Sequence, residues 1–262
     1  MIRKSLHILL WFLLLAGVAV LLGFARESNN QAPCRQLDIQ VISRSGNPFV
    51  RPETIREAIT GQFDSLVGRS LNRDIMGSLH RLVQAMPHVH RADVYRTIDG
   101  ELKVDAWLRD PIVRVVNRAN ESFYIDTDGY MFPLSGEYTA RVMLASGNIG
   151  TAFQAGKNVR ETPGREKAGA MEVLHDVYRL ADYIHRDPFW LASIDHIVVR
   201  PDGKYELIPG HGAHIIEFGE ASDLEEKFNK LKLFYKHGLT RVGWHSYSRV
   251  NLEYRQQVIC SK

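Results

Sequence analysis

The sequence lacks the short motifs that identify common enzyme classes. It has no G-x-S-x-G turn, no H-E-x-x-H helix and no C-x-x-C pair, which supply a nucleophile, a zinc site and a redox centre respectively. The segment from Gly150 to Lys157 differs from a phosphate-binding loop, because five residues separate Gly150 from Gly156 and Asn158 replaces the Ser or Thr that meets magnesium. We therefore predict a protein that is not an enzyme and uses no cofactor.

Cysteine is scarce, and no metal-ligand pattern is present. Cys34 and Cys260 are the only cysteines. An oxidising compartment would let them pair, but two unpaired thiols are an equally good interpretation, because the sequence does not show that their Cα atoms come close. Carboxylates and cysteines at ligand spacing are missing around the histidines, so we predict surface or turn histidines and no metal site. These histidines are His80, His88, His90, His211 and His214.

Long blocks of one charge are also absent. The formal net charge is +3, with acidic and basic residues spread along the chain. This distribution argues against a nucleic-acid-binding surface.

The N-terminus is the exception to this even composition. Arg3 and Lys4 precede an unbroken apolar run from Ile8 to Phe24. Counted as residues 6–25, about 20 residues are enough for a helix that crosses a bilayer. We predict a single transmembrane helix with a cytoplasmic N-terminus, residues 1–27 forming tail and helix and residues 28–36 a spacer. A cleaved signal peptide is the rival interpretation, but its apolar core is usually shorter.

Residues 37–110 show the pattern of a small α+β module. Leu37, Ile39 and Val41 alternate as a strand, and Pro52 begins a helix. A second helical stripe runs from Leu71 to Met86, and Asp99-Gly100 then predicts a hairpin. The predicted order is strand, helix, helix, strand, strand, with both helices on one face of the sheet.

Residues 111–262 are predicted to form a β-rich domain with two or more helices. Asp128-Gly129 predicts another hairpin, and a helix is expected from Met171 to Ile184. Phe189-Trp190-Leu191 forms an apolar tip, for which core packing of Trp190 is favoured over contact with a partner. Ser222 to Glu225 has the form of a capping box for a helix that should stop at Gly238.

The C-terminus ends in strand-like alternation. Val250, Leu252 and Tyr254 alternate with polar residues, and Val258-Ile259-Cys260 follows. A terminal strand at a sheet edge presents unpaired backbone groups to which another chain can add a strand, unless the chain's own tail protects it. The predicted partner-binding residues are Arg249, Val250, Asn251, Leu252, Glu253, Tyr254, Arg255, Gln256 and Gln257.

Three segments, in order along the chain, resemble motifs of the FtsQ/DivIB family of bacterial cell-division proteins. Leu108 to Val113 is similar to the family's junction between domains, with Leu108 where Glu is usual. Tyr124 to Phe132 is similar to its Val-Asp-x-x-Gly-x-x-Phe segment. Val250 to Tyr254 is similar to its Val-Asp-Leu-Arg-Tyr motif, with Asn251 for Asp and Glu253 for Arg.

This resemblance implies a POTRA domain at residues 37–110 and a β domain at 111–262, both periplasmic and anchored in the inner membrane at the division septum. It implies a non-enzymatic scaffold of the divisome that recruits FtsB and FtsL and couples early division proteins to septal peptidoglycan synthesis. The partner strand would pair with the last strands, near Tyr254. The alternatives are another POTRA-bearing envelope-assembly or secretion protein, and an anchored periplasmic cell-wall enzyme.

Overall fold

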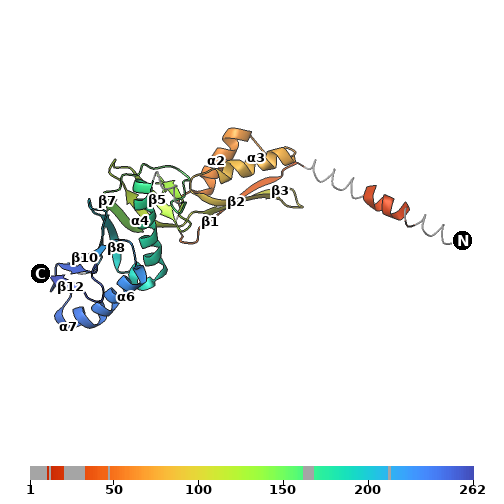
Figure 1. Ribbon diagram of the computed structural model, residues 1–262. Helices are drawn as coiled ribbons and strands as arrows, with labels where there is room; N and C mark the ends of the chain where they lie inside the picture. The colour runs from red at the N-terminus through yellow and green to blue at the C-terminus, as the bar shows by residue number, and fades with distance from the viewer. Residues whose placement is uncertain (1–10, 12, 21–32, 47, 162–167, 212–213) are drawn as a thin grey trace. The chain divides into compact units, whose positions relative to one another are not determined.

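The protein has a mixed α+β fold, as predicted. The computed structural model describes residues 11, 13–20, 33–46, 48–161, 168–211 and 214–262 (Figure 1). The chain divides into two compact units. The first contains Met1–Ile42 and Val50–Leu108, and the second contains Ser43–Phe49 and Arg109–Lys262.

The predicted membrane span, residues 6–25, lies mainly outside the described residues. Its described positions, 11 and 13–20, are helical, and their side chains are exposed. Across the described part of the chain, no helix is both long enough and apolar enough to cross a bilayer.

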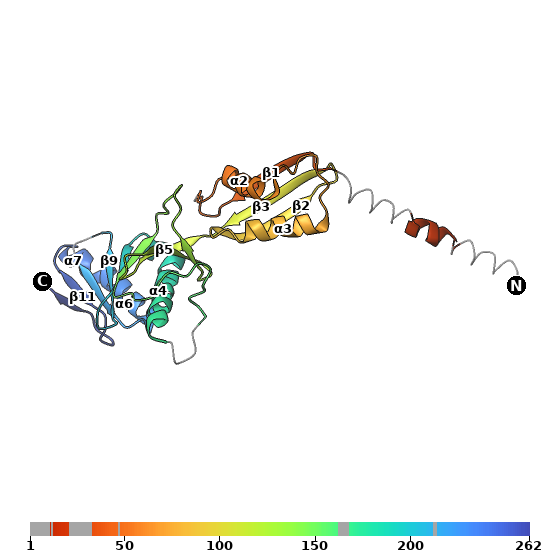
Figure 2. The ribbon, with the colours of Figure 1, turned by 90° about the horizontal axis from the view of Figure 1, so that it is seen from above.

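The first unit has the strand, helix, helix, strand, strand order expected from its pattern. Its sheet order is β1-β3-β2, with β1 parallel and β2 antiparallel to β3. Both helices lie over one face of the sheet (Figures 1 and 2). The elements are β1 (Gln36–Ile42), α2 (Pro52–Phe63), α3 (Arg73–Gln84), β2 (Val89–Arg96) and β3 (Glu101–Leu108).

Local signals set the ends of these elements. Pro52 occupies the first turn of α2, where its missing N–H costs no hydrogen bond. The side chain of Asn72 accepts a hydrogen bond from the N–H of Ile75 at 2.9 Å and so caps α3. Gly100 has φ +86° in the turn between β2 and β3, which confirms the predicted hairpin.

The second unit contains a nine-stranded mixed sheet. Its strand order is β12-β11-β10-β9-β8-β7-β4-β5-β6. The hairpin predicted at Asp128-Gly129 is present, since β5 and β6 are antiparallel neighbours. The strands are β4 (Pro111–Val116), β5 (Ser122–Asp126), β6 (Met131–Pro133), β7 (Met143–Gly147), β8 (Ile194–Val199), β9 (Tyr205–Pro209), β10 (Ile215–Gly219), β11 (Arg249–Asn251) and β12 (Ile259–Ser261).

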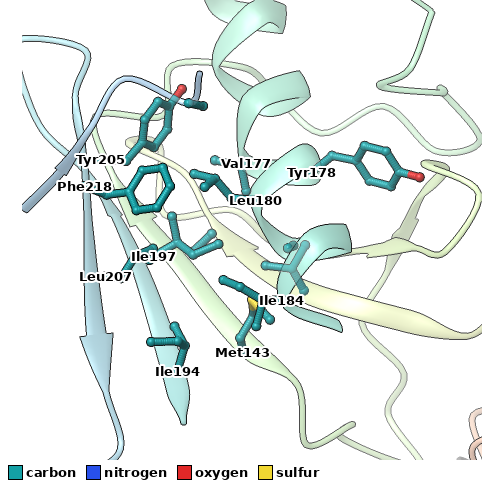
Figure 3. Close-up of a cluster of buried hydrophobic side chains, with 14 of the residues drawn as sticks. Met143, Val177, Tyr178, Leu180, Ile184, Ile194, Ile197, Tyr205, Leu207 and Phe218 are labelled. Carbon is teal, nitrogen blue, oxygen red and sulfur yellow. The ribbon is translucent and has the colours of Figure 1, made fainter. Parts of the chain in front are cut away.

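Helices cover one face of this sheet and form the core with it. In Figure 3, Val177, Leu180 and Ile184 of α4 point toward Ile197 and Leu207 of the strands. These five side chains have no exposed surface. The helical segments are α4 (Ala168–Arg186), α5 (Pro188–Leu191), α6 (Leu224–Phe234), the π-helical turn η2 (Tyr235–Leu239) and α7 (Thr240–Val242).

The last helical region differs from its prediction at both ends. The capping box does not form, because Asp223 is the N-cap residue with φ +50° and its side chain makes no capping hydrogen bond. Gly238 does not stop the helix, which continues through η2 and α7 to Gly243 with φ +96°. The lack of a side chain at Gly238 allows close packing against Phe234, since a Cβ at this position would lie 2.7 Å from the Phe234 ring.

A buried histidine lies beside the π-helical turn. His214, immediately before β10, is 2% exposed, and its Nε2 lies 2.8 Å from the hydroxyl of Tyr235. Its Nδ1 has no hydrogen-bond partner among the described residues. Burial lowers the pKa of His214, because the charged imidazolium loses its hydration.

We expect His214 to make stability depend on pH. Its pKa in the folded protein is below the value of about 6.5 in the unfolded chain, so the unfolded state binds the proton more readily. Stability that is fully present above about pH 6.5 is therefore lost as pH falls toward the folded pKa. Urea unfolding between pH 7.5 and pH 5.5 should show this loss of stability, and His214→Gln should reduce the dependence on pH. The control is His237→Gln, at an exposed position. An equal reduction by both variants would contradict the role of His214.

Candidate functional site

The predicted terminal strand is two short strands joined by a turn. β11 pairs in parallel with β10 on one side and antiparallel with β12 on the other. The expectation that the strand containing Val250 lies at the sheet edge is therefore wrong, because β11 has two neighbours. The edge strand is β12, since the chain reverses after Asn251 and returns alongside β11.

The structure brings the predicted site residues to one end of the sheet but not onto one strand. Arg249, Val250 and Asn251 form β11, while residues 252–257 form the reversal outside regular strands. Val250 and Leu252 are fully buried, and Tyr254 is 52% exposed. The N–H of Leu252 donates to the carbonyl of Glu217 at 2.9 Å, so Leu252 belongs to the core rather than to a contact surface.

Charged groups fix β11 to the two strands beyond it. Nη1 of Arg249 lies 2.5 Å from Glu217 and 3.1 Å from Glu206, on neighbouring strands. Nδ2 of Asn251 donates to the other carboxylate oxygen of Glu217 at 2.8 Å. The hydrogen bond from Arg249 is the main reason why the pKa of Glu217 is lowered, and Asn251 adds to it.

Two lysines hold the reversal in shape. Nζ of Lys230, on α6, donates to the carbonyls of Leu252 at 3.0 Å and Tyr254 at 2.6 Å. Nζ of Lys204 lies 2.6 Å from the carboxylate of Glu253. A hollow of about 260 Å³ lies here, and its walls include these residues and Arg255. Glu253 and the carbonyls of Leu252 and Tyr254 are therefore engaged in contacts that shape the chain's own turn.

The two edges of the large sheet differ. At the far edge, the N–H of Met131 donates to the carbonyl of Lys157, and the N–H of Gly156 donates to the carbonyl of Met131, both at 2.9 Å. Tyr130 also forms a bridge with Asn158. The segment 156–158 therefore covers β6. Within the described ranges, β12 has no strand on its outer side.

The alternation of hydrogen bonds indicates which groups of β12 face outward. The N–H of Ile215 donates to the carbonyl of Ser248, and the N–H of Leu252 donates back to Glu217. The N–H and C=O of Val250 therefore point to β10, and those of Arg249 and Asn251 point to β12. Their partners are Ser261 and Ile259. The N–H and C=O of Cys260 consequently face the open edge.

The edge strand Ile259–Ser261 is not among the predicted binding residues. Its sequence signal was present, since Val258-Ile259-Cys260 is an apolar run near the C-terminus. The alternation predicts this run as the continuation of one terminal strand, whereas the chain reverses before it. Ile259 is 44% exposed, whereas Cys260 is partly buried against the core. Cys260 and Cys34 are both free thiols in the structure.

A second arrangement joins two of the segments singled out in the sequence. Nη1 of Arg109 lies 2.7 Å from Oδ2 of Asp126, whose side chain is 1% exposed. Oδ1 of Asp126 accepts hydrogen bonds from the N–H groups of Asp128 and Tyr130, and the Arg109 guanidinium lies 4.9 Å from the centre of the Tyr130 ring. Burial raises the pKa of Asp126, and the hydrogen bonds from Arg109 and Tyr130 oppose it. This pair is a structural anchor of the hairpin β5–β6.

Comparison with known proteins adds one match. No curated protein matches the chain. The family model described as FtsQ/DivIB, C-terminal related matches residues 110–261. The match covers the nine-stranded sheet with its edge strand β12 and the helical region from α4 to α7. The chain belongs to the FtsQ/DivIB, C-terminal related family.

Proposed function

We propose that this protein is a single-pass scaffold of the bacterial division machinery and that it captures its partner by strand addition to β12. Membership of the family indicates a role in cell division. One observation supports the mechanism above all: among the residues that the structure describes, no strand covers the edge at β12, whereas residues 156–158 cover the opposite edge at β6. Strand addition uses such an edge, because backbone hydrogen bonds supply affinity and neighbouring side chains supply selectivity.

The partners in this proposal are FtsB- and FtsL-type division proteins. A strand from the partner would bond to the outward N–H and C=O of Cys260. It would lie beside the exposed side chains of Ile259 and Tyr254, which supply apolar contact area at the same end of the sheet. The scaffold would act without catalysis, linking early division proteins to septal peptidoglycan synthesis.

The remaining parts of the proposal concern the rest of the chain. Residues 37–110 are assigned as a POTRA-like domain, which the order β1-α2-α3-β2-β3 supports. Residues 111–262 are assigned as the β domain. Residues 6–25 are assigned as the membrane anchor on their length and apolar composition. The N-terminus would then be cytoplasmic and both domains periplasmic, at the septum.

Replacing Cys260 by proline tests the mechanism. Proline removes the outward N–H and leaves the inward hydrogen bonds of Ile259 and Ser261 in place. We expect Cys260→Pro to weaken binding of the FtsB/FtsL-type partner by about tenfold or more, since a lost hydrogen bond costs about 1 kcal/mol and the ring obstructs the added strand. The measurement is the dissociation constant of the full-length protein reconstituted in lipid nanodiscs.

The matched control is Cys260→Val, which removes the same thiol and keeps the N–H and the strand preference. It should bind as the unaltered protein does. Equal binding by the proline and valine variants would contradict strand addition at β12. Circular dichroism of both variants shows whether the sheet is intact.

A further inference from the structure

Exposed apolar side chains of the second unit gather at its C-terminal end. None of the large hydrophobic side chains described between residues 109 and 188 is exposed. Those that are exposed belong to α5, to the α6–α7 region, to the reversal after β11 and to β12. They are Phe189, Leu191, Leu233, Val242, Trp244, Tyr254 and Ile259. Such a concentration on one part of a surface is typical of a site that contacts another molecule.

The α6–α7 part of this end is also strongly basic. No Asp or Glu occurs from residue 227 to residue 252. The Lys and Arg residues in that stretch are Lys227, Lys230, Lys232, Lys236, Arg241 and Arg249. An acid-free stretch of this length attracts an anionic group, because no carboxylate of its own neutralises it.

Most of these cations have partners among the described residues, but two form no ion pair there. Lys230 binds backbone carbonyls of the reversal, Lys232 lies 3.2 Å from Asp187, and Arg249 pairs with glutamates of the sheet. Lys227 donates to the carbonyl of Glu220. Lys236 and Arg241 are exposed and form no ion pair with any described residue. They remain available to an incoming carboxylate.

These two cations belong to the same helical run as the exposed Leu233 and Val242, and Trp244 follows this run closely. Leu233 is 61% exposed, Val242 49% and Trp244 39%. Trp244 is held edge-on against Tyr235, with ring centres 5.2 Å apart. The continuous helical run through η2 carries Leu233, Lys236 and Arg241, and α7 ends at Val242. We call Leu233, Lys236, Arg241, Val242 and Trp244 the α6–α7 surface.

The α6–α7 surface lies next to one end of the edge strand. The N–H of Ser248 donates to the carbonyl of Ser261 at 2.9 Å. Tyr247, the residue before it, packs against Phe234 with ring centres 6.3 Å apart. The segment from Trp244 to Ser248 thus connects the α6–α7 surface to the last residue of β12. α7 and β12 belong to the same blue end of the chain in Figure 1.

We infer that the α6–α7 surface is a second docking site for the partner strand captured by β12, and that it receives an acidic segment with an apolar side chain next to that strand. This inference rests on the proposed function. A strand paired with β12 leaves the sheet near Ser261, beside the α6–α7 surface. Carboxylates of the partner meet Lys236 and Arg241, and the apolar side chain covers Leu233 and Trp244.

An acidic peptide fits the site better than other occupants. Its backbone continues directly from the strand at β12, and its charge is complementary to the two unpaired cations. An anionic lipid or a second copy of this chain would not require the apolar side chains to adjoin the end of β12. These two occupants become outcomes of the test.

The test compares two pairs of charge reversals in the full-length protein in nanodiscs. Lys236→Glu with Arg241→Glu alters the α6–α7 surface, and Lys157→Glu with Arg118→Glu makes the same change in net charge elsewhere on the second unit. We expect the first pair to weaken binding of the FtsB/FtsL-type partner by about tenfold and to reduce its salt dependence. The control pair should change binding less than about twofold.

A second variant distinguishes direct apolar contact with the partner from long-range electrostatic attraction. Leu233→Ser removes an exposed apolar group without altering charge, and it should weaken binding by about three- to fivefold with an unchanged salt dependence. Because Leu233 is exposed, this variant keeps the fold. Trp244 is less suitable, since its ring also supports Tyr235.

The outcomes distinguish the inference from the proposed function. If Cys260→Pro weakens binding while the Lys236/Arg241 and Leu233 variants bind like their controls, the α6–α7 surface is not a docking site and strand addition stands. If Cys260→Pro has no effect, the proposed mechanism fails and the inference fails with it. The inference is also overturned if both charge-reversal pairs weaken binding equally, or if the first pair affects only binding to anionic phospholipid vesicles or self-association in sedimentation.

Discussion

Asp126→Ala is expected to lower the free energy of unfolding of the second unit by about 3–5 kcal/mol, because it removes the buried carboxylate of an ion pair. The Arg109 side chain is only 13% exposed and lies 2.7 Å from Asp126, whose side chain is 1% exposed. The change also removes the acceptor for the N–H groups of Asp128 and Tyr130. Urea unfolding followed by circular dichroism measures the loss.

An exposed ion pair supplies the control for this prediction. Arg186 pairs with Asp182 one turn away on α4, and its side chain is 74% exposed. Arg186→Ala should cost about 0.5 kcal/mol or less. A double variant, Arg109→Met with Asp126→Leu, should recover the part of the stability that the unpaired charge costs, because no charge then remains buried. The part lost with the acceptor for Asp128 and Tyr130 should remain lost. A loss near 0.5 kcal/mol for Asp126→Ala would show that the pair does not anchor the hairpin.

Trp190→Ala is the other large expected effect, at about 3–5 kcal/mol of destabilisation, because a large buried ring leaves a cavity that its neighbours fill only in part. Trp190 is 1% exposed, which confirms the core role predicted from its sequence context. Its ring centre lies 5.0 Å from that of Phe228 and 6.0 Å from that of Tyr235. Since Tyr235 begins the π-helical turn, loss of Trp190 should also loosen the α6–α7 surface.

The neighbouring aromatic residue is a matched control. Phe189 is 39% exposed and contacts the ammonium group of Lys232 from outside the core. Phe189→Ala should cost less than about 1 kcal/mol. Urea unfolding of both variants gives the comparison, and hydrogen exchange of residues 235–242 reports on the surface. Similar losses of unfolding free energy for Trp190→Ala and Phe189→Ala would contradict the conclusion that Trp190 belongs to the core and Phe189 does not.

The sequence was sufficient wherever a local signal decides a local conformation. Asp99-Gly100 and Asp128-Gly129 predicted hairpins that are present, because such dipeptides adopt the positive φ angles of a tight turn at little cost. Pro52 marked the first turn of a helix. The mixed α+β class followed from the alternation of such segments, and the family resemblance rested on short motifs and on their order along the chain.

The capping-box prediction failed because a local motif competes with its tertiary environment. The side chain of Asp223 makes no capping hydrogen bond. The helix continues through Gly238, in the π-helical turn whose Tyr235 packs against Trp190 and whose Gly238 lies against the ring of Phe234. The helix ends at Gly243 instead. A glycine has two uses, positive φ and lack of a side chain, and the sequence alone does not distinguish them.

What the sequence by itself determined is the set of elements, their approximate order and the family. Only the tertiary structure decided which strand forms the edge. Alternation predicted Val250 and Leu252 as partner-binding residues of a terminal strand, but both are buried. Pairing between β10 and β11, and between β11 and β12, depends on contacts between distant residues. Strand order reflects the burial of a whole sheet face rather than the preference of any one segment. For that reason the candidate site is the edge strand β12, which follows the predicted residues 249–257 in the chain.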